Sequence, residues 1–340
     1  TDMSQMFQGA TNFNGIISGW DTSSVTRMNG MFYEASTFNQ PLDNWDVSNV
    51  LKMQQMFLGA SVFNQDLNSW NNRVSNVTDM SQMFQGATNF NGIISGWDTS
   101  SVTNMAGMFN GANIFNQPLD SWDVSNVENM NFTFANATDF KQPLNNWDTS
   151  SVEGMERMFL NAREFNQDIS SWDVDIVTTM KEMFRGARKF NQDISSWDTS
   201  SVETMANMFN DARKFNRHLN SWNVSSVTNM WGMFFGASDF NQPLNLWTVS
   251  NVTTLSETFK NAVIFNQDLS DWVTSSVVYM NGTFQNTAFN NGETSGVSNT
   301  LQWDTSSVTR MESLFESATV FNGNISDWVV SNVTNMNRMF

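Results

Sequence analysis

A repeat of 25 residues constrains the fold of this 340-residue chain more than any other feature. Ten of the twelve intervals between the tryptophans that mark it are 25 residues long. These tryptophans are Trp20, Trp45, Trp70, Trp97, Trp122, Trp147, Trp172, Trp197, Trp222, Trp247, Trp272, Trp303 and Trp328. The two longer intervals contain insertions at 71–74 and 290–302, and residues 1–26 recur unchanged as 78–103. Such periods are typical of solenoids and propellers. We therefore expect a single array over 1–340, with an irregular loop at 290–302 and an incomplete repeat at each end.

The first part of each repeat predicts a strand. In the copy at 115–124 the pattern is F-N-x-x-L-x-x-W-x-V, which places Trp122 and Val124 two residues apart, on one side of an extended chain. The second residue after the Trp is Val or Thr in nearly every copy, and both are β-branched strand formers. We expect Leu119, Trp122 and Val124 to point into a core.

The second part of each repeat predicts a short helix. In the copy at 102–112 apolar residues recur mostly three or four positions apart, as on the inward face of a helix. They are Val102, Met105, Met108, Phe109 and Ala112. Ser125 with Glu128 fits the S-x-x-E capping box at a helix start, and a glycine such as Gly111 suits a helix exit.

A strand and one short helix in every 25 residues is the arrangement of a leucine-rich repeat. The expected fold is an α/β solenoid, a right-handed leucine-rich-repeat-like array of about 13 strand–short-helix repeats with one parallel sheet. The Trp-Asp dipeptide also occurs in β-propellers. A propeller blade needs about 40–45 residues and four strands, so we exclude that fold.

The composition excludes several classes of function. A formal net charge of −17 disfavours nucleic acid and anionic membrane surfaces as partners. The chain has no Cys, hence no thiolate metal site, and no apolar run long enough for membrane insertion within this segment. His218 is the sole His, and we find no phosphate-binding loop and no uniquely placed acid–base pair. We therefore expect no enzymatic activity.

The phrase FNQPLDxWDVSNVxxMxxMFxxA recurs along essentially the whole chain and resembles the repeats of the BspA-like family of surface proteins. Such repeats look like leucine-rich repeats in which Trp, Met and Phe replace the usual Leu and Ile ladder. The resemblance implies an extracellular or cell-surface protein linked to adhesion, and it implies no catalytic residue. We expect the capping, signal and anchor segments to lie outside these 340 residues.

Two polar residues recur at equivalent positions and would form ladders along stacked repeats. An Asn follows the Phe in twelve of thirteen copies, with Lys141 as the exception, and we interpret it as satisfying backbone groups at a turn. An Asp follows the Trp in eight copies, five of them consecutive: Asp98, Asp123, Asp148, Asp173 and Asp198. Stacked like charges repel. These Asp either stabilise turns in contact with solvent or bind a cation, for which calcium is the candidate.

A basic stripe departs from the repeat. After the closing Ala, where most copies have Ser or Thr, three consecutive copies have Arg and two of these add Lys: Arg163, Arg188, Arg213, Lys189 and Lys214. In a chain with only 16 Lys and Arg, this stripe could hold a sulfated glycan or an acidic patch of another copy of the chain. The alternative is a solvated edge whose charges pair with nearby Glu and Asp.

Two further features could mark a surface. Trp231 is the one Trp outside the repeat position; with Phe235 it either forms an aromatic patch for a protein or carbohydrate or packs against an adjacent turn. The chain also has eight N-x-S/T sequons, which are candidate glycosylation sites. They are Asn76, Asn131, Asn136, Asn223, Asn251, Asn281, Asn324 and Asn332.

These patterns favour two classes of function. The first is an adhesion protein that binds a protein or glycan at the cell surface through one face or through the basic stripe. The second is a structural subunit or spacer of an extracellular fibre, assembled with further copies of itself through repeat ends and lateral patches. Near-identical repeats favour the second class, and the local cluster of Arg favours the first.

Overall fold

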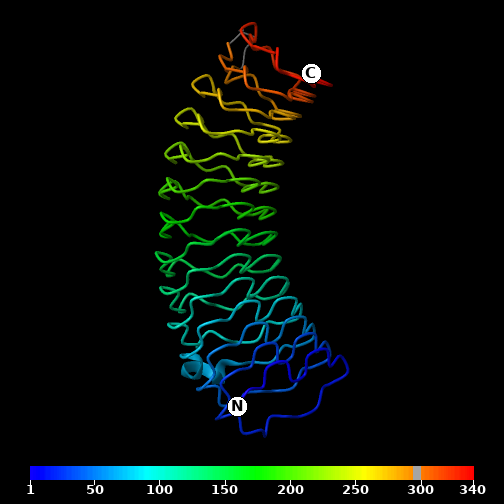
Figure 1. Ribbon diagram of the computed structural model, residues 1–340, viewed down its shortest axis with the longest axis vertical. Coiled ribbons are helices and arrows are strands. Elements are labelled where there is room, and N and C mark those ends of the chain that lie inside the picture. Colours follow the sequence, from blue (N-terminus) through cyan, green and yellow to red (C-terminus); the bar gives the residue numbers. More distant parts are fainter. Residues whose placement is uncertain (294–299) are drawn as a thin grey trace. The chain divides into compact units, whose positions relative to one another are not determined.

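The computed structural model describes residues 1–293 and 300–340. Contacts within the chain define two compact units, Thr1–Ile176 and Val177–Phe340. In each unit one repeat makes one coil, and successive coils stack on one another (Figure 1). Each unit is therefore a repeat solenoid, as the 25-residue period predicted.

The predicted strand–short-helix repeat is wrong in its local structure. The stretch predicted as a helix at 102–112 is a run of turns, and the stretch predicted as a strand at 115–124 contains no strand. The one helix in the described residues is the 3-10 helix η1 (Asn68–Val74), which contains the insertion at 71–74. Of the second insertion, the loop predicted at 290–302, residues 294–299 lie outside the described residues.

Hydrogen bonds between coils explain why the turn segment is not a helix. Four alternate backbone N–H groups donate to carbonyl oxygens of the next coil at 2.8–3.0 Å. They belong to Met105, Gly107, Phe109 and Gly111. The N–H groups of Met108 and Ala112 instead close turns on the carbonyl three residues earlier. Gly107 and Gly111 have φ of 63° and 76°, which such turns require and a right-handed helix excludes.

Parallel pairing is present, but as single bridges at a different place in the repeat. In Thr1–Ile176 the residue before the first Met of each coil pairs with its equivalent in the next coil, as Asn104 does with Asn129. In Val177–Phe340 the same pairing joins Thr204 to Asn229. The expectation of a sheet through the Trp positions is wrong, because the backbone pairs run through the start of the turn segment.

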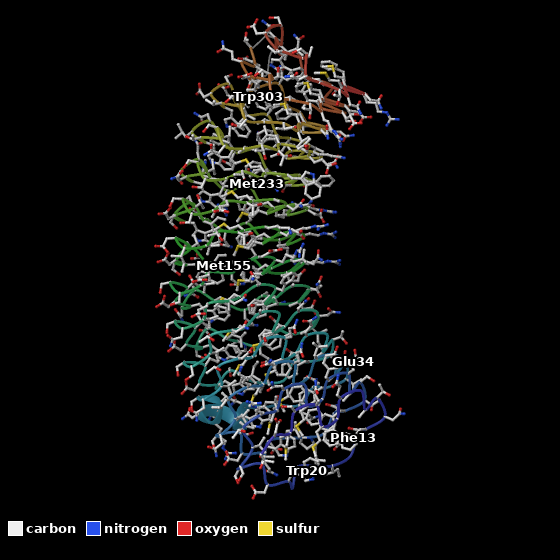
Figure 2. All side chains as sticks on the ribbon, viewed as in Figure 1. Phe13, Trp20, Glu34, Met155, Met233 and Trp303 are labelled. Carbon is white, nitrogen blue, oxygen red and sulfur yellow. The ribbon has the colours of Figure 1, made fainter. Side chains whose placement is uncertain are left out.

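Stacked aromatic rings fill the inside of the coils. The rings of Trp97 and Trp122 are 6.0 Å apart between centroids and 4° from parallel. Leu119, Trp122 and Val124 are at most 2% exposed, which confirms that they point inward. Methionine side chains such as Met155 are also fully buried (Figure 2). The inward face was predictable because large apolar side chains must leave water whichever backbone carries them.

Two polar ladders join neighbouring coils. The Oδ1 atom of Asn91 accepts from the backbone N–H of Asn116 at 2.9 Å, and Asn116 accepts from that of Lys141 at 3.1 Å. This confirms the structural interpretation of the Asn ladder. Where Thr replaces Val after Trp-Asp it is buried and donates across coils, as Thr149 does to the carbonyl oxygen of Asp173 at 2.7 Å. A buried hydroxyl thereby keeps a partner.

Candidate functional site

The Asp ladder closes turns. The Oδ1 atom of Asp123 accepts from the N–H and the hydroxyl of Ser125, at 3.0 and 2.6 Å. The other ladder members accept from the N–H two residues on: Asp98, Asp148, Asp173 and Asp198. Hydrogen bonds from Ser150 lower the pKa of Asp148 below its ordinary value.

Among the described residues, no group of three or more His, Cys, Asp or Glu side chains could hold a metal ion. Calcium binding stays a prediction, which calorimetry with millimolar Ca²⁺ tests.

Acidic residues pair with much of the basic stripe. Atoms Nη2 of Arg188 and Nε of Arg213 lie 2.9 and 2.7 Å from the carboxylate of Asp211. The ammonium group of Lys214 lies 2.9 Å from the carboxylate of Asp239. These three side chains are thus held by partners within the chain, and each such pair contributes little when exposed to solvent.

The members of the basic stripe are exposed, except for the half-buried Arg188. Lys189 belongs with Arg188, Arg213 and Lys214 to the unit Val177–Phe340, whereas Arg163 belongs to the other unit. The structure therefore brings together four of the five residues. Binding of a sulfated glycan at these four stays a prediction.

The predicted aromatic patch lies on one coil. Trp231 is 45% exposed, and Phe235, half-buried, follows it one turn later. The ammonium group of Lys260, from the next coil, lies 5.6 Å from the centroid of the Phe235 ring. Trp231 is therefore an exposed aromatic residue, and Phe235 is partly covered by a cation.

Most sequon side chains take part in bonds between coils. The Nδ2 atoms of three donate at 2.7–2.8 Å to a serine carbonyl of the preceding coil: Asn76, Asn251 and Asn332. Asn131 accepts from a backbone N–H of the next coil, Asn136 bonds to asparagines of both neighbouring coils, and the Oδ1 atom of Asn281 is buried. Asn223 and Asn324 are exposed and accept from the serine two residues on. A glycan on any of the first three would replace one of the two Nδ2 hydrogens, on the atom that donates between coils.

Three grooves lie on the same side of the coils, which we call the turn face. The turn face consists of the exposed parts of the residue that forms the parallel bridge in each coil, such as Asn104, and of the two turns that follow it. Two grooves, of about 540 and 400 Å³, belong to Thr1–Ile176, and one of about 370 Å³ belongs to Val177–Phe340. Each contains a first-turn glycine with positive φ: Gly30, Gly107 or Gly282. Where the side chain is missing, a depression opens between the side chains of neighbouring coils.

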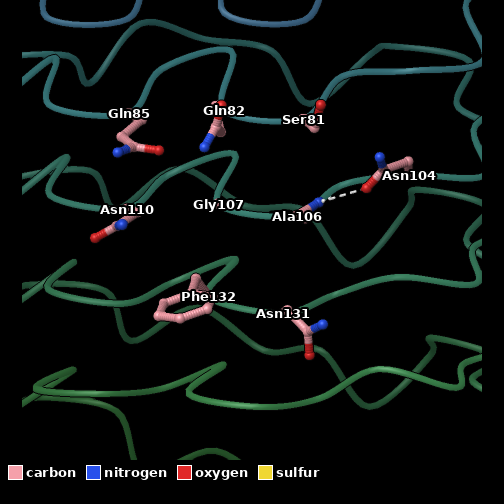
Figure 3. A pocket seen from close by; sticks show the side chains of 9 residues that line it. All are labelled: Ser81, Gln82, Gln85, Asn104, Ala106, Gly107, Asn110, Asn131 and Phe132. Carbon is pink, nitrogen blue, oxygen red and sulfur yellow. Dashed lines mark hydrogen bonds between the residues drawn. The ribbon is translucent and has the colours of Figure 1, made fainter.

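The groove around Gly107 differs from the other two in having no charged lining residue. We call it the amide groove (Figure 3), and its lining residues are Ser81, Gln82, Gln85, Asn104, Ala106, Gly107, Asn110, Asn131 and Phe132. The other two grooves include acidic and basic side chains, such as Asp2 with Arg27 and Glu257 with Lys260. A neutral, carboxamide-rich groove on a chain of net charge −17 is a local exception.

Phe132 in the amide groove has an unfavourable backbone conformation. Its φ is 60°, and it is the one aromatic among the described residues with positive φ. Equivalent positions in neighbouring coils carry Gln82, Gly107 and Arg157. Gln82 and Arg157 have a φ of 56°, so the left-handed conformation belongs to the turn itself, and what distinguishes Phe132 is that a bulky ring occupies it at a cost of roughly 1–3 kcal/mol. The guanidinium carbon of Arg157 lies 5.2 Å from the ring centroid, a cation–π contact that holds the ring.

The amide groove was not predicted from the sequence. The sequence nevertheless contains a signal for it. Gly107 lies two residues after the first Met of its coil, and Phe132 occupies the equivalent position in the next coil. This signal was overlooked because the segment was interpreted as a helix. A right-handed helix has no left-handed turn position, so nothing marked Gly107 and Phe132 as special.

The repeat matches the family described as Mycoplasma protein of unknown function, DUF285, in five overlapping segments that span the chain. These segments are residues 1–74, 71–162, 141–242, 216–301 and 292–340. The chain belongs to this family. Membership in DUF285 places the chain among repeat proteins and assigns no activity. No curated protein matches the chain.

Comparison with solved structures adds little to the DUF285 assignment. A chain from the structure titled "Crystal structure of TLR13-ssRNA13 complex" aligns with 8% identity and a TM-score of 0.22. The alignment covers 93% of this chain and 49% of that chain, so this chain spans about half the length of the matched structure. A similarity this weak carries no functional inference. Among the described residues, the DUF285 chain has no helix long and apolar enough to cross a membrane.

Proposed function

We propose that this chain is a non-enzymatic binding scaffold of an extracellular or cell-surface protein, and that its turn face contacts a glycan or a protein. The observation that carries the proposal is the contrast between surfaces. Asn, Asp and Trp of the repeat phrase bond within or between coils, as Asn116, Asp123 and Trp122 do. On the turn face, the carboxamides of Gln82 and Asn110 also accept between coils, but their nitrogens have no acceptor among the described residues, and they lie beside a groove. The turn face also carries exposed aromatic side chains such as Trp231.

Two arguments support a surface location and a role in adhesion. The repeat phrase resembles that of BspA-like surface proteins, with which leucine-rich-repeat-like arrays are associated. A stacked array also offers the same turn positions in each coil, so differences between coils can be used for recognition. Catalysis is not proposed, because the sole histidine, His218, is exposed and the ladder carboxylates accept hydrogen bonds from the residue two positions on, a serine for Asp123 and Asp148 and an aspartate for Asp173.

Adhesion of the immobilised chain tests this proposal. We expect saturable binding to at least one class of extracellular partner, either glycans on an array or extracellular protein, with retention when Asp123 is changed to Asn. That substitution serves as the control because Asn223 forms the same turn in another coil, at 3.1 Å from the N–H of Ser225. Absence of binding to cells, glycans and extracellular proteins alike would contradict the proposal.

A second candidate function is a structural spacer or fibre subunit. It is favoured by the ladders within each unit, where neighbouring coils exchange backbone hydrogen bonds, Asn bonds and ring stacks. A spacer needs no more than such bonds between neighbouring coils, because each repeat of an array is stabilised by the repeats next to it. Negative-stain electron microscopy separates the two candidates. Continuous filaments with regular contacts favour the spacer, and isolated rods favour the binding scaffold.

A further inference from the structure

We propose that the amide groove binds one uncharged sugar ring, with the C–H face of a pyranose packed on Phe132 and its hydroxyls bonded to carboxamides. The proposal rests on the function proposed above and specifies the ligand class of one site. A volume of about 400 Å³ lies within the range of small-molecule pockets, roughly 300–1,000 Å³.

The Phe132 ring supplies the apolar surface of the site. Figure 3 shows the ring beside Asn131 on one coil, with Gly107 and Asn110 on the neighbouring coil. Aromatic faces carry negative charge density, and the C–H groups of a sugar carry partial positive charge, so the two surfaces attract. The backbone of Phe132 is strained, with φ of 60°, and its ring is held by Arg157. The coil thus places a ring here at a cost that packing of the coils does not require.

Hydrogen bonds within the chain fix the orientation of three carboxamides. The Oδ1 atom of Asn104 accepts from the N–H of Ala106 at 3.0 Å, as Figure 3 shows. The side-chain oxygens of Gln82 and Asn110 accept from carboxamide nitrogens of the preceding and following coils, at 2.6 and 3.1 Å. In the described residues the nitrogens of these three amides have no acceptor. They are therefore available to donate to a ligand.

The same groove also offers acceptors. The Gln85 side chain has no hydrogen-bond partner among the described residues, and the Ser81 hydroxyl can both donate and accept. Sugar hydroxyls likewise donate and accept, so a mixed set of neutral groups matches them. No lining residue is charged, and the nearby cation, Arg157 on the Phe132 ring, lies 3.3 Å from the carboxylate of Glu156, so the groove offers no unpaired counter-ion for a sulfate or carboxylate. This favours a neutral sugar over the sulfated glycan expected at the basic stripe.

Gly107 keeps the groove open. A Cβ atom added there would lie 3.3 Å from both Cγ of Gln82 and Oε1 of Gln85. In the other unit, Asn207 occupies the equivalent position with a φ of 55°. The backbone conformation therefore tolerates Asn, and Gly107→Asn should fill the groove without unfolding the coil.

The test measures binding of neutral glycans by the full chain, first on an array of neutral, sialylated and sulfated glycans and then by calorimetry with the best neutral oligosaccharide. Phe132→Asn removes the ring and relieves the backbone strain. Glu34→Asn is the matched control, since Glu34 is exposed, has a φ of 55° and lies outside the amide groove. We expect Phe132→Asn and Gly107→Asn to weaken binding by about tenfold or more, and Glu34→Asn to leave it unchanged.

Thermal unfolding of each variant accompanies the binding assay, and Phe132→Asn should unfold no earlier than the wild type. Equal affinity of the wild type and Phe132→Asn would overturn the proposal, as would a preference for charged glycans or for a peptide. Binding of no neutral glycan would also overturn it. If the chain still adheres to cells or to extracellular proteins in that case, the scaffold function survives and only the assignment of the amide groove fails.

Discussion

The indole Nε1 of Trp122 donates a hydrogen bond to the carbonyl oxygen of Ile94, 3.2 Å away in the preceding coil. The same bond joins Trp147 to Leu119 and Trp247 to Leu219, at 2.9 and 2.8 Å. The repeated Trp is therefore both a stacked ring in the core and a donor that joins coils. Phe and Tyr cannot replace it in both roles, because Phe has no N–H and Tyr donates from a different place.

Replacing Trp122 by Phe should lower the free energy of unfolding by about 1–3 kcal/mol, because the Ile94 carbonyl loses a donor and the smaller ring leaves space. Urea denaturation followed by circular dichroism measures the change. Trp231→Phe is the control. Since Trp231 is 45% exposed, the expected change is within about 0.5 kcal/mol. Equal effects of the two substitutions would show that the inter-coil bond contributes nothing.

The stability of a Gly107→Ala variant distinguishes between a turn and a helix at this position. In a helix interior, Ala is more stable than Gly by about 1 kcal/mol. In the observed turn, with φ of 63°, Ala is instead less stable by about 1–2 kcal/mol because its Cβ disfavours the left-handed region. We expect a lower unfolding temperature for Gly107→Ala, and a smaller loss for Gly107→Asn. A stabilised Gly107→Ala variant would restore the helical interpretation.

Removing one rung of the Asn ladder should destabilise the coils on either side. Asn116→Ala leaves the N–H of Lys141 and the Gln142 amide without the Oδ1 acceptor that lies 3.1 Å from each. The expected loss is about 1–2 kcal/mol in the free energy of unfolding. Asn116→Asp keeps an acceptor and should lose less. Hydrogen exchange at the Lys141 amide reports the effect locally, and unchanged protection in Asn116→Ala would contradict the assignment.

The Asp turns make stability sensitive to acid. Hydrogen bonds from the serine two residues on lower the pKa of Asp148, Asp198 and Asp304 below the ordinary value of 3.8. A carboxyl with a lowered pKa in the folded state adds stability above its unfolded pKa, and loses that stability as pH falls through the folded value. The wild type should therefore lose stability below about pH 4.

The triple substitution of Asp148, Asp198 and Asp304 by Asn tests that pH dependence. Asn keeps the turn, as Asn223 does, but does not titrate. We expect a lower melting temperature for the variant than for the wild type at pH 7, and a smaller decrease in the variant between pH 4 and pH 2. An identical acid-induced decrease in both proteins would show that these carboxyls do not contribute.

The sequence predicted which residues face inward but not the backbone that carries them. Val102, Met105 and Phe109 are buried as expected, because burial of large apolar groups dominates in either conformation. The helix prediction failed because apolar spacings of three and four residues also fit two successive turns. The distinguishing signal was the recurrence of Gly, Asn or Gln at the left-handed positions, of which Gly107 and Gln82 are examples.

The candidate site was less predictable than the fold. The Asp and Asn ladders were identified from repetition, and their turn and inter-coil bonds follow from ordinary side-chain chemistry. The amide groove depends on Gly107 and Phe132 occupying neighbouring coils on one face. Such proximity between equivalent positions becomes visible only when the register of the coils is known.

The central claim is that the turn face binds a partner while the repeat phrase builds the coils. A crystal structure of the chain with the neutral oligosaccharide selected on the array tests this claim most directly. The account predicts one sugar ring stacked on Phe132, with its hydroxyls near Gln82, Asn104 and Asn110. A ligand seated against Arg188 and Arg213, or against the Asp turns, would contradict the claim.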